Sequence, residues 1–183
     1  MAWTFVALGD SVTEGVGDPL PDGSLLGWAG RLSGWLAEQQ PDLRFENLAR
    51  RSLTTAEIRE SQLPAALEMR PNLASVIAGV NDALKPEFDA AIFEREFTDL
   101  IEPLSEAGAT VLTATFPNVR WGRLLSAQMR STIHGRLEVV CDVVRRVASE
   151  HDALCIDAWN APETRDPRVM SIDRLTRAPG DTG

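Results

Sequence analysis

The alternation of strand-length and helix-length segments is the feature that most restricts the fold of this chain. Short apolar segments alternate with longer segments. In the longer segments the apolar residues recur three and four positions apart, as in amphipathic helices. Two such helical stripes run from Ile92 to Leu104 and from Ile133 to Ala148. Because parallel strands need a long crossover connection, this alternation predicts right-handed β-α-β units and an α/β fold. Strands are expected at Trp3–Leu8, Arg44–Leu48, Leu73–Ala78, Thr110–Ala114 and Ala153–Ile156.

The length of the chain, 183 residues, fits one domain with a sizeable core. We expect about five parallel strands in the flavodoxin-like order 2-1-3-4-5. In such a sheet the reactive loops gather at the carboxyl ends of the strands, in a crevice where the strand order reverses. The loops after the first and third strands should therefore face the same crevice.

Three polar loops follow the first three expected strands. They are Gly9-Asp10-Ser11, the segment NLARRS from Asn47 to Ser52, and the segment GVND from Gly79 to Asp82. Each loop taken alone is also ordinary turn or helix-cap chemistry. Their occurrence in this order, after consecutive strands, favours a functional site at one edge of the sheet.

A serine at the end of a strand can act as a nucleophile only when other groups support it. Its hydroxyl needs a base, usually an oriented histidine, and the tetrahedral oxyanion needs preorganised donors. The backbone N–H of Ser11, the side-chain amide of Asn81 and a backbone N–H near Ser52 are candidate donors. Asp10 is expected to brace the site by accepting hydrogen bonds from neighbouring backbone or from Asn81, and Gly79 supports the loop that carries Asn81.

With these segments in place, the chain resembles the SGNH, or GDSL-type, hydrolase family. The matching segments are GDSVTEG from Gly9 to Gly15, NLARRS, GVND, and DPRVMSIDRL from Asp166 to Leu175, so the resemblance covers nearly the whole chain. It implies a three-layer α/β/α fold and hydrolysis of carboxylic esters or thioesters through an acyl-serine. Neither a cofactor nor a metal is implied, and the sequence shows no His/Asp cluster with ligand spacing.

The resemblance also implies roles by position. Ser11 corresponds to the nucleophile, Asn81 to the oxyanion-hole asparagine and Asp173 to the acid that orients the catalytic histidine. The family's glycine in the second segment falls on Ser52 here. A backbone N–H survives this change, but the loop is expected to need a conformation that serine adopts less readily than glycine.

The chain departs from the family pattern near residue 176. The family places its catalytic histidine three residues after the aspartate, and that position is Thr176 here. A threonine hydroxyl is a poor proton acceptor near neutral pH, so we expect catalysis to be impaired. The family's last helix is expected to be missing, so that a single domain over residues 1–176 is followed by a loose tail, residues 177–183.

Two histidines are available as substitutes for the missing base. His151 ends the long helix before the fifth strand, which should place it at the sheet edge opposite Ser11. His134 lies near the start of that helix and therefore at the same edge as Ser11. A histidine on a helix face usually has a structural role, and His134 is the candidate substitute base.

Composition restricts the partners and the compartment. The chain has 18 basic and 27 acidic residues, a net charge of −9, which argues against nucleic acid or an anionic membrane surface as the main partner. No apolar run approaches the roughly 20 residues of a membrane span, and no signal-peptide pattern is present. Cys141 and Cys155 are expected to be buried free thiols. We expect a cytoplasmic protein that acts on a small acyl ester.

Three interpretations of the function stay open on the sequence alone. The chain is an SGNH-type hydrolase that is slow or uses an unusual base, or an ordinary serine esterase changed by truncation or a shift of reading frame. Alternatively, it is a non-catalytic protein of this fold that binds a ligand or partner. Loss of the last helix would also uncover apolar surface on the fifth strand or the first helix, which predicts a homo-oligomer.

Overall fold

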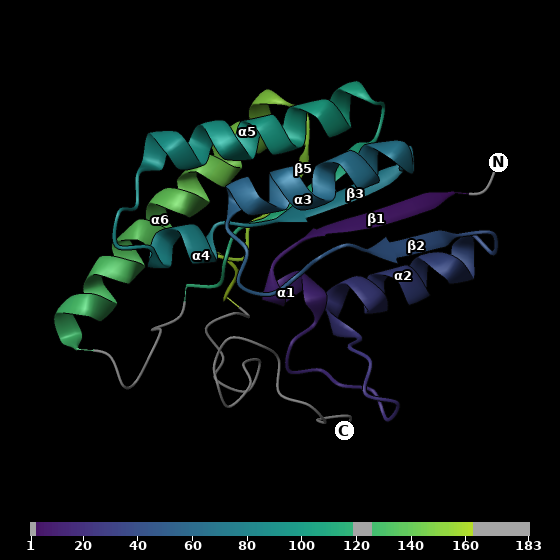
Figure 1. Cartoon of the computed structure of the whole chain (residues 1–183), viewed down its shortest axis with the longest axis horizontal. Coiled ribbons are helices and arrows are strands. Elements are labelled where there is room, and N and C mark those ends of the chain that lie inside the picture. The colour runs from purple at the N-terminus through teal and green to yellow at the C-terminus, as the bar shows by residue number, and fades with distance from the viewer. Residues whose placement is uncertain (1–2, 119–125, 163–183) are drawn as a thin grey trace.

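The computed structural model describes residues 3–118 and 126–162 (Figure 1). Its strands form one sheet in the order β2-β1-β3-β4-β5, and every neighbouring pair is parallel. The predicted fold class and strand order are confirmed, and no strand end differs from its expected position by more than one residue. The strands are β1 (Thr4–Gly9), β2 (Arg44–Asn47), β3 (Leu73–Ile77), β4 (Thr110–Ala114) and β5 (Leu154–Ile156).

Helices cover both faces of the sheet and give it three layers. α3, α5 and α6 lie on one face and α2 on the other (Figure 1). Right-handed crossovers require this division, because only the connection from β1 to β2 runs toward the β2 edge. None of the helices in the two described ranges is long and apolar enough to cross a membrane. The helices are α1 (Ser11–Glu14), α2 (Gly27–Gln39), α3 (Thr55–Glu68), α4 (Val80–Leu84), α5 (Ala90–Glu106) and α6 (Ala127–Glu150).

The central strand β1 divides the hydrophobic interior into two cores. Val6 and Leu8 point into the larger core beneath α3, α5 and α6, whereas Phe5 and Ala7 point into the smaller core beneath α2. Successive side chains of a strand point to opposite faces, so a strand covered on both sides is apolar at every position. Because β1 is buried on both faces, it cannot slide along its axis, and this fixes the position of the loop that follows it.

Helix α5 supplies much of the larger core. Asp89 caps it by accepting hydrogen bonds from the backbone N–H groups of Ala91 and Ile92 at 2.8 and 3.0 Å. The predicted apolar stripe is correct except at its first residue, because Ile92 is 51% exposed beside an open cleft at the start of the helix. The buried residues of α5 are Phe93, Phe97, Leu100, Ile101 and Leu104.

The two sides of α5 predict different costs for truncation to alanine. Phe97 is fully buried, so Phe97→Ala should lower the free energy of unfolding by about 3–5 kcal/mol, since it leaves a cavity. Ile92→Ala, the control on the same helix, should cost less than about 1 kcal/mol. Urea unfolding followed by circular dichroism measures both, and equal losses would contradict this packing of α5.

Candidate active site

The first turn of the site follows the central strand. β1 ends at Gly9 and α1 begins at Ser11, so the half-buried Ser11 stands at the carboxyl edge of the sheet. The side chain of Asp10 caps α1 by accepting a hydrogen bond from the Val12 N–H at 3.0 Å. A Cβ atom on Gly9 would lie only 2.7 Å from the carbonyl oxygen of Ile77. Glycine is therefore required where the chain turns toward Ser11.

Gln62 of α3 holds the same turn, and the sequence analysis did not identify it. Its side chain accepts a hydrogen bond from the Gly9 N–H at 2.9 Å and donates one to the Gly9 carbonyl at 3.0 Å. Only 3% of Gln62 is exposed. The sequence pattern that could have predicted this role is the position of Gln62, four residues after Ile58 on the buried side of the helix. A buried amide there needs hydrogen-bond partners.

The second loop of the site leaves β2 through Asn47. The Asn47 side chain donates to the Thr13 carbonyl at 2.9 Å and accepts from the Ala49 N–H at 3.1 Å, so it ties this loop to α1. Ser52 follows with a φ of 68°. This is the left-handed region that glycine adopts freely and serine does not. The expected conformational demand at Ser52 is confirmed.

The third loop leaves β3 and forms the five-residue helix α4. Gly79 begins it with a φ of 124°, and a Cβ there would lie 2.6 Å from a core side chain of α6. Arg136, also on α6, donates hydrogen bonds to the carbonyl oxygens of Ala83, Lys85 and Pro86 at 3.2, 2.6 and 3.0 Å. α4 is therefore held from both ends by α6.

Two successive side chains of α4 join the three loops. Nδ2 of Asn81 donates to Oδ2 of Asp10 at 3.1 Å and to the carbonyl oxygen of Leu53 at 2.9 Å. Oδ2 of Asp82 accepts from the Thr55 N–H at 3.0 Å and from the Thr55 hydroxyl at 2.9 Å. Asp10 thus makes both of its expected contacts, and the turn of Ser11 and the loop of Ser52 meet at Asn81.

Burial dominates the electrostatics of this junction. It raises the pKa of Asp10 from 3.8 to about 6, against the hydrogen bond from Val12, and the neighbouring Asp82 raises it further. Burial also raises the pKa of Asp82, while the two hydrogen bonds from Thr55 and the charge of Lys85 lower it. Two partly desolvated carboxyl groups therefore lie at this junction, and only that of Asp10 bonds to the Asn81 amide.

The two histidines lie where the strand order places them. α6 runs antiparallel to the strands and ends at Glu150, with His151 as its C-cap shortly before β5 begins, so His151 is at the opposite edge from Ser11. His134 is near the start of α6, and its ring packs against that of Trp159 with centroids 5.1 Å apart. Within residues 3–118 and 126–162, no hydrogen bond joins His134 to Ser11.

The remaining predicted site residues, Asp173 and Thr176, lie outside the described residues, as do the expected tail and the position of the family's last helix. Among the residues that are described, no group of three or more His, Cys, Asp or Glu side chains could hold a metal ion. Cys141 and Cys155 are both free thiols, as expected, but only Cys141 is buried. Cys155 is half-buried because it belongs to the edge strand β5.

The fold and the site together define an SGNH-type α/β protein. One edge of its doubly wound sheet carries the capped turn of Ser11, the Asn81 amide and the loop in which Ser52 has a positive φ. The sequence matches the GDSL-like lipase/acylhydrolase family over residues 7–175, and the chain belongs to that family. Family membership places the chain among ester hydrolases. No curated protein sequence matches the chain significantly.

Solved structures with the same fold include hydrolases of several origins. An α/β-hydrolase enzyme from the metagenome of Lake Arreo, Spain, is 20% identical with a TM-score of 0.74, over 96% of this chain and 87% of that one. A lipase/acylhydrolase from Enterococcus faecalis is 19% identical with a TM-score of 0.72, over 97% and 88%. An acetylxylan esterase from Geobacillus stearothermophilus is 19% identical with a TM-score of 0.70, over 96% and 87%.

The raised pKa of Asp10 predicts a change of stability with pH. Because the folded protein binds this proton more tightly than the unfolded chain, ionised Asp10 lowers the free energy of unfolding as the pH rises from 3.8 through about 6. The full effect is about 3 kcal/mol, from the difference between these two pKa values. The stability of Asp10→Asn relative to wild type should therefore increase between about pH 4 and pH 7.

Urea unfolding of both proteins at several pH values measures this difference. Asp22→Asn is the control with the opposite sign, because hydrogen bonds from Ser24 lower the pKa of Asp22. Its stability relative to wild type should fall rather than rise as Asp22 ionises. Parallel pH curves for wild type and Asp10→Asn would show that Asp10 is not withdrawn from water.

Proposed function

We propose that this protein is a serine hydrolase that cleaves a carboxylic ester or thioester through an acyl-serine on Ser11. The observation that carries the proposal is the Asn81 amide, which bonds to Asp10 beside Ser11 and to Leu53 beside Ser52. These two bonds tie together the loops that carry Ser11, Ser52 and Asn81, and this supports a role for Ser11 as nucleophile with three oxyanion donors nearby. Membership of the GDSL-like lipase/acylhydrolase family supports the same reaction class.

In the proposed reaction, Oγ of Ser11 attacks the acyl carbon and the carbonyl oxygen becomes an oxyanion. The N–H of Ser11 is available to it because the first N–H groups of a helix have no acceptor within the helix. The N–H of Ser52 is a second donor, from the position where the family has glycine. Nδ2 of Asn81 is the third donor, and its two protons already bond to Asp10 and Leu53. The oxyanion must therefore share or displace one of these two bonds.

The proposed mechanism has no assigned general base for Ser11. The family resemblance implies an Asp173–histidine pair, and this chain has Thr176 at the histidine position. A structurally similar acetylxylan esterase has been studied as a catalytic mutant with its histidine replaced by alanine. We infer that Ser11 lacks its usual proton acceptor here and that the chain hydrolyses esters slowly.

Restoring the histidine tests this inference. In an assay with p-nitrophenyl acetate or butyrate, Thr176→His should raise the Ser11-dependent rate by at least about 100-fold, the usual gain from a positioned general base. Ser11→Ala in the same background is the control and should abolish the gain. His134→Ala should leave the rate unchanged, since that ring packs on Trp159.

Four outcomes would contradict the proposal or part of it. No gain in Thr176→His would show that the histidine at this position is not the missing part, and no Ser11-dependent hydrolysis in any variant between about pH 6 and pH 9 would contradict the proposed hydrolase. A loss of activity in His134→Ala would identify His134 as the working base. Saturable ligand binding that survives Ser11→Ala, without any hydrolysis, would favour a non-catalytic binding protein instead.

We also propose that the protein self-associates in the cytoplasm through the sheet face that carries α2. Leu154 and Ile156 of the edge strand β5 are 57% and 58% exposed. They are in register with Leu112 and Ala114, and Leu112 packs toward the α2 core, so they share the face of that core. Trp35 of α2 is also 60% exposed, but α2 packs against β2 at the other edge of the sheet, so Trp35 is a separate exposed residue. Exposed apolar side chains on one face are typical of an interface between copies.

Sedimentation velocity measures the self-association. A dimer or larger species should form at micromolar concentration and should dissociate when Leu154 and Ile156 are both replaced by lysine. Met69→Lys, at an exposed apolar residue of another element, is the control and should leave the sedimentation coefficient unchanged. A wild-type protein that stays monomeric at all concentrations would contradict the proposal.

A further inference from the structure

We propose that Asp82 is a positioning residue that clamps the oxyanion loop, defined here as residues 52–54, through its two hydrogen bonds to Thr55. Its catalytic consequence rests on the proposed function, because that function assigns the Ser52 N–H to the oxyanion. The clamp itself is a property of the described contacts.

Asp82 holds the chain at Thr55, two residues after the Leu53 carbonyl that Asn81 binds. Asn81 bonds to the carbonyl of Leu53 at 2.9 Å, and the next side chain, Asp82, bonds to the N–H and hydroxyl of Thr55 through a single oxygen, at 3.0 and 2.9 Å. Thr55 is fully buried. Two consecutive residues of α4 therefore fix the backbone shortly after Ser52, at two points.

The loop needs such support because of Ser52. A φ of 68° is a conformation that an L-residue with a side chain leaves readily unless its surroundings hold it. The direction of the Ser52 N–H depends on this conformation. Anchoring the residues immediately after Ser52 keeps that N–H in one orientation, and preorganisation of this kind is what an oxyanion donor requires.

The bonds of Asp82 are not needed to begin α3. That helix has its own capping box, in which the Thr54 side chain accepts a hydrogen bond from the third N–H of the helix. The Glu57 carboxylate in turn accepts from the Thr54 N–H at 2.8 Å and from the Thr54 hydroxyl at 2.6 Å. The contact between Asp82 and Thr55 is an additional bond, between α4 and the first residue of α3. A role in positioning explains it better than a role in helix initiation.

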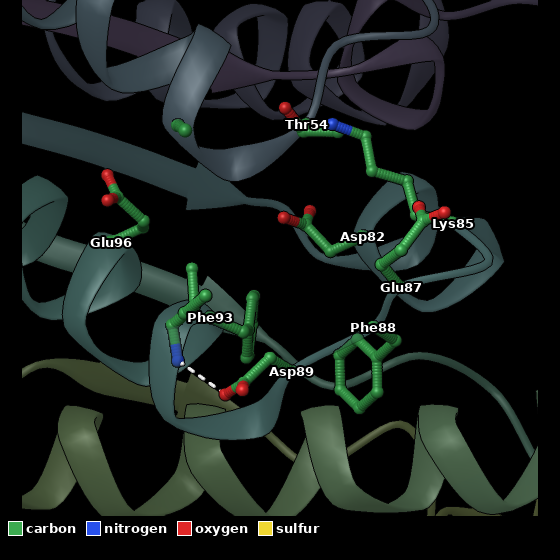
Figure 2. Close-up of a pocket in the computed structure, with 10 residues that line it drawn as sticks. Thr54, Asp82, Lys85, Glu87, Phe88, Asp89, Phe93 and Glu96 are labelled. Carbon is green, nitrogen blue, oxygen red and sulfur yellow. Dashed lines mark hydrogen bonds between the residues drawn. The ribbon is translucent and has the colours of Figure 1, made fainter.

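Keeping the Asp82 carboxylate ionised at this place is unfavourable, because it is partly withdrawn from water. The carboxylate points into a cleft between the start of α3 and the start of α5, as Figure 2 shows. This cleft has a volume of about 220 Å³. Burial there raises the pKa of Asp82, and the Thr55 bonds oppose this effect. Glu87 lines the same cleft but is exposed. It is a matched carboxylate outside the clamp.

Hydrogen exchange followed by mass spectrometry tests the clamp directly on the full chain. In Asp82→Ala, exchange of a peptide that spans residues 50–56 should become at least about tenfold faster, because the loop opens locally. Asp82→Asn should stay within about threefold of wild type, since its amide oxygen can accept both bonds from Thr55. Glu87→Gln should leave the exchange unchanged.

The same variants in the Thr176→His background test the catalytic consequence. Asp82→Ala should lower kcat by about 10–100-fold while KM for p-nitrophenyl butyrate stays within about twofold, because a displaced donor affects the transition state most. Asp82→Asn should keep most of kcat. Rescue by Asp82→Asn would show that the two bonds to Thr55, rather than the charge of Asp82, carry the effect, and a fall in kcat at constant KM separates positioning from a general loss of structure.

Several results would overturn the proposal. They are unchanged exchange in Asp82→Ala, an equal effect of Glu87→Gln, or a loss in Asp82→Asn as large as in Asp82→Ala. If Asp82→Ala does not fold, Thr55→Val should speed the exchange of the loop and Thr55→Ser should not, and equal behaviour of the two would reject the clamp. If no variant shows Ser11-dependent hydrolysis, the proposed function fails, and the exchange data still decide the clamp.

Discussion

The whole site depends on the side-chain amide of Asn81. It is the point where the loops after β1, β2 and β3 are joined, because Nδ2 donates to Asp10 and to the Leu53 carbonyl. An aspartate at this position would have no proton to donate and would add a third carboxyl group beside Asp10 and Asp82. The two N–H groups of this one neutral amide bind the carboxyl group of Asp10 and a backbone carbonyl together.

Several local choices at this edge are unfavourable when taken singly. Ser52 has a positive φ, and burial makes the ionised form of Asp10 less favourable. The packing of β1 between two cores compensates for these costs, since the strand cannot shift without exposing Phe5 or Leu8. Conflicts between local preference and global fold of this kind are common at functional sites.

Much of the fold could be predicted from the sequence, because strand and helix patterns alternate and because parallel crossovers have one hand. The loops with Ser11, Ser52 and Asn81 were predictable for the same reason, since each follows a strand. The partners of these loops were not. Gln62 and Thr55 belong to α3, and their contacts with Gly9 and Asp82 depend on how that helix lies across the strand ends. Residue spacing indicates that Gln62 is buried and needs partners, but it does not identify those partners, nor does it predict the packing of His134 against Trp159.

The short helix α4 has a consequence for the order in which this protein loses its structure. Five residues are too few to form a stable helix without tertiary contacts, and α4 persists because Arg136 and the Gly79 packing attach it to α6. α4 contributes Val80 and Ala83 to the larger core, most of which comes from the strands and from α3, α5 and α6. On heating, α4 should detach while the sheet remains intact, so the site has a lower melting temperature than the fold that carries it.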